Sequence, residues 1–144
     1  MSIKTIRTAL KTQLEDDSDL QTMFDNFIEE KRPDPSELDT ITIRKAGSEE
    51  DKKEFGYNYK TSCTYSYEII AMMKRNNIED GDEAQIVSDQ YIRQAIMADV
   101  SLGQTVAWVK IGKTIWGEDM SNNEIYYTIV PIECFIDESP TSRD

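Results

Sequence analysis

Acidic clusters are the side chains of this sequence with the greatest capacity for chemistry. They are EDDSD at 15–19, EED at 49–51 and EDGDE at 79–83. Because carboxylates are the ligands that Mg²⁺ and Ca²⁺ prefer, Asp80, Asp82 and Glu83 are candidates for a divalent ion. They lack the D-x-[DN]-x-[DN]-G spacing and the later bidentate Glu of a calcium loop. Solvated loop charge, with Asp82 as a helix N-cap, is therefore the favoured interpretation, and no metal or other cofactor is predicted.

Other catalytic chemistry finds little support in the sequence. There is no histidine, which removes Ser-His-Asp and Cys-His catalysis and the commonest metal ligand. Cys63 and Cys134 form neither a Cys-x-x-Cys motif nor a disulfide framework, and no glycine-rich phosphate loop occurs. We therefore predict that the protein is not an enzyme. A small acidic metal-dependent enzyme that uses Asp80, Asp82 and Glu83 is the alternative from another functional class.

The net charge of the chain restricts its partners. The formal charge is −12, from 28 acidic and 16 basic residues, whereas binding to phosphate backbones needs clustered cations. A surface that grips DNA or anionic lipid is therefore disfavoured. The negative charge favours solubility, and it would also repel a nucleic acid that passes nearby. A DNA-mimic inhibitor is a further, weaker alternative.

The chain also lacks the sequence signals of export and membrane insertion. The opening MSIKTIRTALKTQLEDD has no apolar core of a signal peptide. No apolar run approaches the roughly 20 residues that a membrane span needs. We expect the protein to be made and used in a reducing cytoplasm.

Helical spacing dominates the N-terminal third of the chain. Apolar residues recur at helical intervals in two stretches: Ile3, Ile6, Leu10 and Leu14, then Leu20, Met23, Phe24, Phe27 and Ile28. This spacing predicts a helix, a short break and a second helical stretch. Ser18 and Gln21 have the spacing of a capping box at the start of the second stretch. Pro33 and Pro35 are predicted to end helical structure.

Four later segments have the composition and alternation of β-strands. They are TITIRKA, TSCTYSYEIIAMMK, TVAWVKIGKTIWG and EIYYTIVPIECFID. A helix from Glu83 to about Ala98 is predicted to cover the sheet. The charged segment 46–58 is predicted to be an exposed loop or an extended hairpin, and residues 138–144 a frayed tail.

The order of these elements predicts the fold class. One or two helices, two strands, a helix and two strands, joined by short connections, indicate an α+β protein. We predict an antiparallel four-stranded sheet with helices packed on one face, in a single domain over 1–144. Pro131 cannot donate to a ladder and predicts an edge strand or a bulge. Trp108 is predicted in the core, whereas Trp116, at a strand end, is a candidate interface anchor.

The stretch ADVSLGQTVAWVKI and the final strand YYTIVPIECFI resemble the tail terminator family of long-tailed bacteriophages, also called tail completion or head–tail joining proteins. In that family an acid, one or two residues and Leu-Gly-Gly follow a helix. Here the pattern consists of Asp99, Leu102 and Gly103, with Gln104 where a second Gly is frequent. Gln104 is expected to adopt ordinary turn dihedrals.

The resemblance covers nearly the whole chain in the family's order. The segments IRTALKTQLEDDSDLQTMF, DTITIRKAGSEED and YSYEIIAM match the opening helix, the first strand and the long paired strand. One departure is NFIEEKRPDPSEL, which is longer and more charged than the family's usual link into the first strand.

The resemblance implies a structural virion protein of the tail or neck, assembled in the host cytoplasm. Its expected form is a hexameric ring that caps the tail tube, ends tube polymerisation and lets DNA pass without specific binding. Its expected partners are further copies of itself, the tail tube protein and the head-side connector protein, with no membrane. Another neck component, such as a head-completion or connector adaptor protein, is the main alternative. The candidate contact residues of the ring are Trp116, Glu49, Glu50, Asp51 and Pro131.

Overall fold

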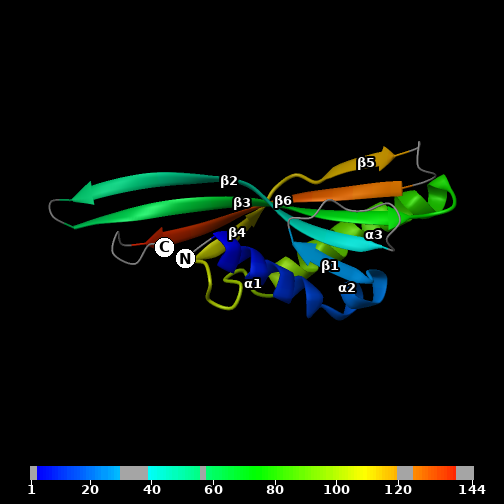
Figure 1. The fold of residues 1–144 in the computed structure, drawn as a ribbon, viewed down its shortest axis with the longest axis horizontal. Coiled ribbons are helices and arrows are strands. Elements are labelled where there is room, and N and C mark those ends of the chain that lie inside the picture. Colours follow the sequence, from blue (N-terminus) through cyan, green and yellow to red (C-terminus); the bar gives the residue numbers. More distant parts are fainter. Residues whose placement is uncertain (1–2, 30–38, 56–57, 120–124, 139–144) are drawn as a thin grey trace.

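The computed structural model describes residues 3–29, 39–55, 58–119 and 125–138. This part of the chain contains three helices and six strands (Figure 1). They are α1 (Ile3–Glu15), α2 (Ser18–Met23), β1 (Asn26–Glu29), β2 (Thr40–Phe55), β3 (Asn58–Lys74), α3 (Ile78–Met97), β4 (Trp108–Ile111), β5 (Ile115–Asp119) and β6 (Ile125–Glu138). Within the described ranges, each helix is too short or too polar to cross a membrane.

All the strands belong to one sheet, which is larger than the sequence predicts. The order is β1-β2-β3-β6-β4, and β5 also pairs with β6. β1 runs parallel to β2, and the remaining pairs are antiparallel. The α+β class is confirmed, but the prediction of a four-stranded antiparallel sheet is wrong. Two segments account for the difference.

The first difference is that Phe27 and Ile28 lie in a strand and not in the second helix. α2 ends at Met23, because Phe24 takes an extended conformation with φ −117° and ψ 137°. Phe27 then pairs with Ile41 in the parallel β1–β2 ladder. A short apolar run fits helical and strand periodicity equally well, and here the tertiary partner decides.

The second difference is that the predicted strand over 105–117 is divided in two. β4 pairs with 132–135 of β6, and β5 pairs with 125–129. Pro131 lies between these two ladders, where its carbonyl oxygen accepts a hydrogen bond from the Gly112 N–H at 2.8 Å. A residue of an antiparallel strand directs its nitrogen and its carbonyl oxygen to the same neighbouring strand. The Pro131 nitrogen, which carries no hydrogen, therefore faces the interval between the β4 and β5 ladders.

The β3–β6 ladder therefore continues through Pro131 opposite Glu68 without a shift of register. The predicted bulge is found beside Pro131, because the register of β4 and β5 with β6 shifts by one residue between the pairs Ile111–Ile132 and Ile115–Ile129. The alternative of an edge strand is wrong, since β6 lies inside the sheet. The break lies in the neighbouring β4–β5 segment, not in the strand that contains the proline.

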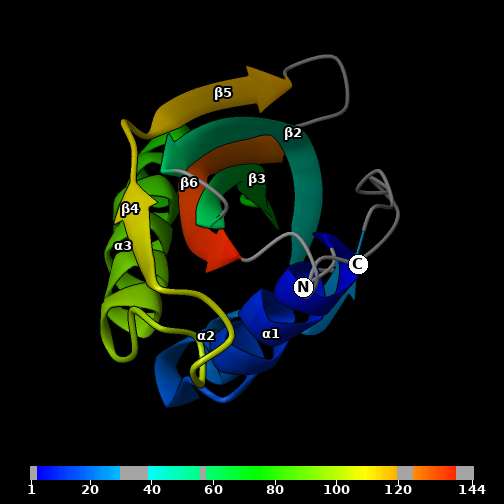
Figure 2. The same cartoon turned by 90° about the vertical axis from the view of Figure 1, so that its left-hand side faces the viewer.

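The core lies between the helices and one face of the sheet. α1 and α3 pack on this face, as two perpendicular views show (Figures 1 and 2). Alternate residues of the central strands face the helices, among them Tyr67, Ile69, Val130 and Ile132. The opposite face also buries Ile70 and Met72.

The apolar residues that predicted α1 and α3 are largely part of this core. Ile6, Leu10, Leu14, Ala84, Ile92, Ala95 and Ile96 are buried. The helix starts differ from the prediction. α2 is capped by Asp17, which accepts from the backbone of Asp19 and Leu20, and α3 is capped by Asn77 instead of Asp82.

The charged segment 46–58 is an extended hairpin, so far as the structure describes it. β2 and β3 remain paired out to Phe55 and Asn58, with a register shift between Lys45 and Gly47. We call the part of this hairpin beyond β1, residues 44–55 with 58–68, the arm. The β3 strand of the arm also pairs with β6 over Thr61–Glu68, and Figure 1 shows that only the outer part of the hairpin extends beyond β6 and the helices. The predicted tail at 138–144 begins at the last residue of β6, and 139–144 lie outside the described residues.

Candidate functional site

The turn after α3 is held together by one carboxylate, Asp99. Its oxygens accept hydrogen bonds from the Ser101 N–H at 3.0 Å, the Ser101 hydroxyl at 2.6 Å and the Gly103 N–H at 2.8 Å. The Ser101 hydroxyl oxygen in turn accepts from the Gln104 N–H at 3.0 Å. The acid of the Asp-x-x-Leu-Gly pattern therefore has a local structural role, since it satisfies donors that the turn leaves without helical partners.

Three consecutive residues of this turn have left-handed backbone conformations. The φ angles are 51° at Leu102, 68° at Gly103 and 67° at Gln104. Gln104 thus takes the left-handed conformation that a second glycine would take, and the expectation of ordinary dihedrals there is wrong. Leu102 is only 3% exposed and joins the core. Burial of its side chain and the Asp99 hydrogen bonds together offset the steric cost of these conformations.

Gln13 of α1 attaches the first helix to the end of α3. Its side-chain amide donates to the carbonyl oxygens of Ala95, Ile96 and Asp99, at distances between 2.9 and 3.1 Å. These carbonyls belong to the last turn of α3 and to the residues beyond it, which lack helical partners. α1 and the Asp99 turn are therefore fixed relative to each other.

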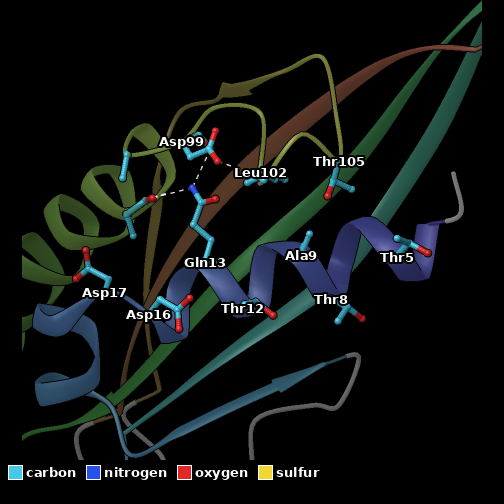
Figure 3. A pocket seen from close by; sticks show the side chains of 13 residues that line it. Thr5, Thr8, Ala9, Thr12, Gln13, Asp16, Asp17, Asp99, Leu102 and Thr105 are labelled. Carbon is cyan, nitrogen blue, oxygen red and sulfur yellow. Dashed lines mark hydrogen bonds between the residues drawn. The ribbon is translucent and has the colours of Figure 1, made fainter.

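An open groove of about 610 Å³ lies between α1 and the Asp99 turn (Figure 3). One wall carries small side chains of α1, and the other is formed by Leu102, Gly103 and Thr105. Asp16 and Asp17 lie at one end of the α1 wall, and Asp99 lies on the same side (Figure 3). The small residues of the α1 wall are Thr5, Thr8, Ala9 and Thr12. The groove is therefore lined by small side chains and is acidic at one end.

The acids at the start of α3 do not converge as metal ligands. Asn77 caps this helix through its side-chain oxygen, which accepts from the Asp80 N–H at 2.8 Å, and the Asn77 amide donates to the Asp80 carboxylate. Asp80 and Glu83 line a second hollow, whereas Asp82 does not. No group of three or more acidic or thiol side chains suited to a metal ion occurs among the described residues.

The two cysteines are unsuited to nucleophilic chemistry. Cys63 and Cys134 are both buried and free. Burial raises the pKa of the Cys134 thiol to about 12, so the reactive thiolate is scarce at neutral pH. Their place in strands β3 and β6 is consistent with packing.

The two tryptophans both lie on strands at the β4–β5 edge and are half exposed. The prediction that Trp108 packs in the core is wrong, because 47% of its surface is accessible and it stacks on Phe135 with 4.1 Å between ring centroids. Trp116 is 50% exposed, and its indole donates to the Gln85 carbonyl at 3.4 Å. Ile115, next to it on the other face of β5, is also exposed.

The remaining candidate contact residues lie in different parts of the sheet. Glu49, Glu50 and Asp51 are in the β2 strand of the arm, at the opposite border of the sheet from β5. Pro131 lies inside β6, between the β4 and β5 ladders. The structure thus brings Asp99, Leu102 and Gly103 into one turn, but it does not bring the contact candidates into one patch.

One polar cluster was not predicted from the sequence. Arg93 of α3 pairs with Asp89 at 3.0 Å and donates to the Gly112 carbonyl at 2.9 Å and to the Thr114 hydroxyl at 2.7 Å. The Thr114 hydroxyl also bonds to Asp89. The cluster anchors the segment between β4 and β5 to α3. The i,i+4 spacing of Asp89 and Arg93 could have predicted their ion pair. The contacts of this pair with Gly112 and Thr114 could not be predicted from the sequence.

The hydrogen bonds of Asp99 predict a pH-dependent contribution to stability. The Ser101 hydroxyl, with the Gly103 and Ser101 N–H groups, lowers the pKa of Asp99 below its ordinary value of 3.8. A lowered folded-state pKa stabilises the fold above the unfolded-state pKa, and the contribution is lost as pH falls through the folded-state value. We expect the stability difference between wild type and Asp99→Ala to be largest near neutral pH and to shrink in acid below pH 3.8.

Urea denaturation between pH 7 and pH 2 measures this difference. The Ser101→Ala variant lacks the donor with the largest effect on the pKa of Asp99. Its free energy of unfolding should therefore fall less in acid than that of the wild type. A difference that stays constant across this range would contradict the assigned role of the carboxylate.

Comparison with solved structures finds a similar fold in a chain of a virion particle. No protein-family model matches the chain, and no curated protein matches it. Among solved structures, a chain from the virion of a native gene transfer agent (GTA) particle has a similar fold, with a TM-score of 0.54 and 7% sequence identity. The match covers 92% of this chain and 94% of that chain. At this level of identity the likeness concerns the fold, and the two chains share it over nearly their full lengths.

Proposed function

We propose that this protein is a structural component of a phage-like virion that forms a ring at the end of the tail tube, where it ends tube growth and joins the tail to the head-side connector. The observation that carries the proposal is the fold shared along nearly the whole chain with a chain of a virion particle. The ordered Asp99, Leu102 and Gly103 turn supports it, since this is the motif on which the resemblance to tail terminators rests.

The sheet offers borders suited to head-to-tail assembly. β2 lies toward one border, where β1 pairs only with Thr40–Ile43, and β4 and β5 lie at the other. Unpaired strand edges favour the addition of a further strand. An interface between two different borders is heterologous, and such interfaces produce rings when the rotation closes. Trp116 and Ile115 on β5 would lie within such a contact.

The charge of the chain fits passage of DNA through a ring. Six chains of −12 each carry −72 in total. Carboxylates that face a lumen repel phosphates and prevent DNA from adhering to the wall. In this proposal the acidic composition serves transit of DNA, and the protein has no catalytic function.

The proposal predicts the phenotype of particles that lack the protein. Without a cap, tube polymerisation is expected to continue past the normal length or to give tails that do not join heads. Electron microscopy of the particles measures tail length and the fraction of joined tails. In a second assay, purified protein added to isolated tail tubes should produce a ring at one tube end in negative stain.

The two assays separate the proposal from its nearest alternative. A different neck component, such as a head-completion or connector adaptor protein, would leave tail length normal and would bind heads instead of tube ends. Tails of normal length that join heads in the absence of the protein would exclude the terminator function.

A further inference from the structure

Each border of the sheet has a segment that a further strand could join. β5 lies at one border (Figure 1), where it pairs with β6, and the described part of the chain places no strand on its other side. At the opposite border the β1–β2 ladder ends at the pair Glu29–Ile43, whereas β2 continues beyond it. The residues that follow, Arg44–Ser48, are exposed. Sheet edges of this kind favour pairing with a strand of another chain.

β5 has the composition of a contact strand. Ile115 and Trp116 are both exposed, and they lie on opposite faces because successive side chains of a strand alternate. Tryptophan is among the residues that contribute most to protein interfaces. A strand from another chain that pairs with β5 would cover part of both side chains.

The charges of the two border segments are complementary. β5 ends with two acids, Glu118 and Asp119, and β6 places no base directly opposite them. The β2 segment begins with two bases, Arg44 and Lys45. In an antiparallel pairing Glu118 lies opposite Lys45, and Asp119 then lies opposite Arg44. Opposite charges at directly paired positions stabilise a sheet.

The same charges do not match in a parallel pairing. A parallel strand would join them only if residues 115–117 lay beside 41–43 of β2. That side of 41–43 is already occupied by β1. A parallel pairing with 44–48 would instead place the acids of β5 beside Gly47 and Ser48. The antiparallel direction is therefore favoured.

The faces of the two segments agree with the antiparallel register. Lys45 lies opposite Tyr67 of β3, and Glu118 lies opposite Tyr126 of β6. Both tyrosines are buried in the core between the sheet and the helices, so Lys45 and Glu118 belong to the helix side of the sheet. A sheet that continues from copy to copy in this register keeps the helices of all copies on one side.

The register shift in β2 leaves room for this pairing. It lies between Lys45 and Gly47, which places Ala46 opposite Gly117 of β5. A Cβ atom added at Gly47 or at Gly117 would meet nothing within 4 Å. The surroundings of both glycines can therefore accommodate the bulged backbone.

We infer that β5 of one copy pairs antiparallel with residues 44–48 of β2 in the next copy, with Glu118 opposite Lys45. The inference rests on the proposed ring, and it adds the strands, direction and register of the contact between subunits. Each copy offers one of these segments at each border, so the same contact repeats around a closed ring. Lys45 and Asp119 also have interactions within their own chain, to which the new charge pairs would be added.

Two cysteine variants test the contact and its direction. Lys45→Cys and Glu118→Cys replace exposed residues. Under oxidising conditions on tail tubes, an equimolar mixture should give a disulfide-linked dimer on a non-reducing gel, because directly opposed strand positions have neighbouring Cβ atoms. Each variant alone should stay monomeric on the gel, since a head-to-tail contact does not bring a residue next to its own copy. The double variant should give a ladder of multiples of the chain.

The matched control mixes Lys45→Cys with Glu83→Cys. Glu83 is also an exposed acid, but it lines the hollow between α2 and α3 instead of the β5 border. This mixture should give no cross-link above background. Native Cys63 and Cys134 are buried and should not contribute.

A charge exchange tests whether the predicted register is the correct one. Glu118→Lys alone and Lys45→Glu alone should each weaken ring formation about fivefold or more at low salt, whereas the two together should restore much of it. The effect should fade at high ionic strength, where exposed charges are screened. Thermal unfolding of each variant checks that the fold is intact.

The outcomes separate this inference from the proposed function. Normal rings whose Lys45–Glu118 mixture cross-links no more than the Glu83 control overturn the strand pairing and leave the ring standing. Cross-linking of either variant with itself indicates a two-fold contact and also overturns it. Cross-linking of the mixture without rings on tail tubes supports the strand pairing and contradicts the proposed function, whereas the absence of both overturns both.

Discussion

Replacement of Gly81 by alanine is expected to destabilise the protein by about 2–3 kcal/mol, although alanine is the better helix former by roughly 1 kcal/mol. Gly81 lies inside α3 and is buried. A Cβ atom at this position would lie 2.2 Å from Cζ of Tyr126 and 2.4 Å from two further ring atoms. The Tyr126 ring is 1% exposed, and in a close-packed core it has little space into which to move.

A double-mutant cycle identifies the ring as the cause. Tyr126→Leu removes the atoms that the new Cβ would meet. In that background Gly81→Ala should be neutral or should stabilise by up to about 1 kcal/mol, as expected for a helix interior. Urea denaturation of the four proteins measures the coupling. If Gly81→Ala has the same cost with and without Tyr126, the close approach is not responsible.

The same glycine shows where sequence reasoning succeeds and where it fails. The apolar spacing of α1 and the later part of α3 predicts both helices and most of their buried residues, because those side chains contact a sheet that one helical face can cover. Gly81, within EDGDE, instead favours a loop, since glycine is a poor helix former. α3 nevertheless begins at Ile78. The tyrosine ring of β6 requires the absence of a side chain at Gly81, and a contact so distant in sequence leaves no local signal.

Contacts between residues that are distant in sequence also explain why the predicted sheet differs from the observed one. The β1 strand depends on pairing with β2, and the division between β4 and β5 depends on Arg93, which holds Gly112 and Thr114. Trp108 has the composition of a core residue but lies on the outer face, where it stacks on Phe135. The alternation of apolar residues predicts that a segment forms a strand. It does not predict which face of a short edge strand packs against the core.

The candidate site was predictable as a motif but not as a structure. Asp99, Leu102 and Gly103 are recognisable in order, whereas the consecutive left-handed residues and the Gln13 contact arise only in the folded chain. The acidic groove combines α1 with a turn about 90 residues away in sequence, so no local pattern reveals it.

The left-handed conformation of Leu102 is expected to remove the usual advantage of alanine over glycine at a buried position. Leu102→Ala should destabilise the fold by about 3 kcal/mol, because a buried leucine loses its transfer energy and leaves a cavity. Leu102→Gly also removes the Cβ group, whose burial contributes about 0.8 kcal/mol, but glycine adopts the observed φ of 51° without steric cost. The relief of roughly 1–2 kcal/mol is similar to the sum of that lost burial and the extra freedom of glycine in the unfolded chain, which costs about 0.4–1 kcal/mol.

We therefore expect the Leu102→Gly and Leu102→Ala variants to have similar stabilities, within roughly 0.5 kcal/mol. Leu10 is the matched control, since it is fully buried in α1, where the backbone is helical. There the glycine variant should be less stable than the alanine variant by about 1 kcal/mol or more. Chemical denaturation of the four variants gives both differences. If glycine is worse than alanine by the same amount at both positions, the left-handed turn does not strain Leu102, and the Asp99 hydrogen bonds have no steric cost to offset.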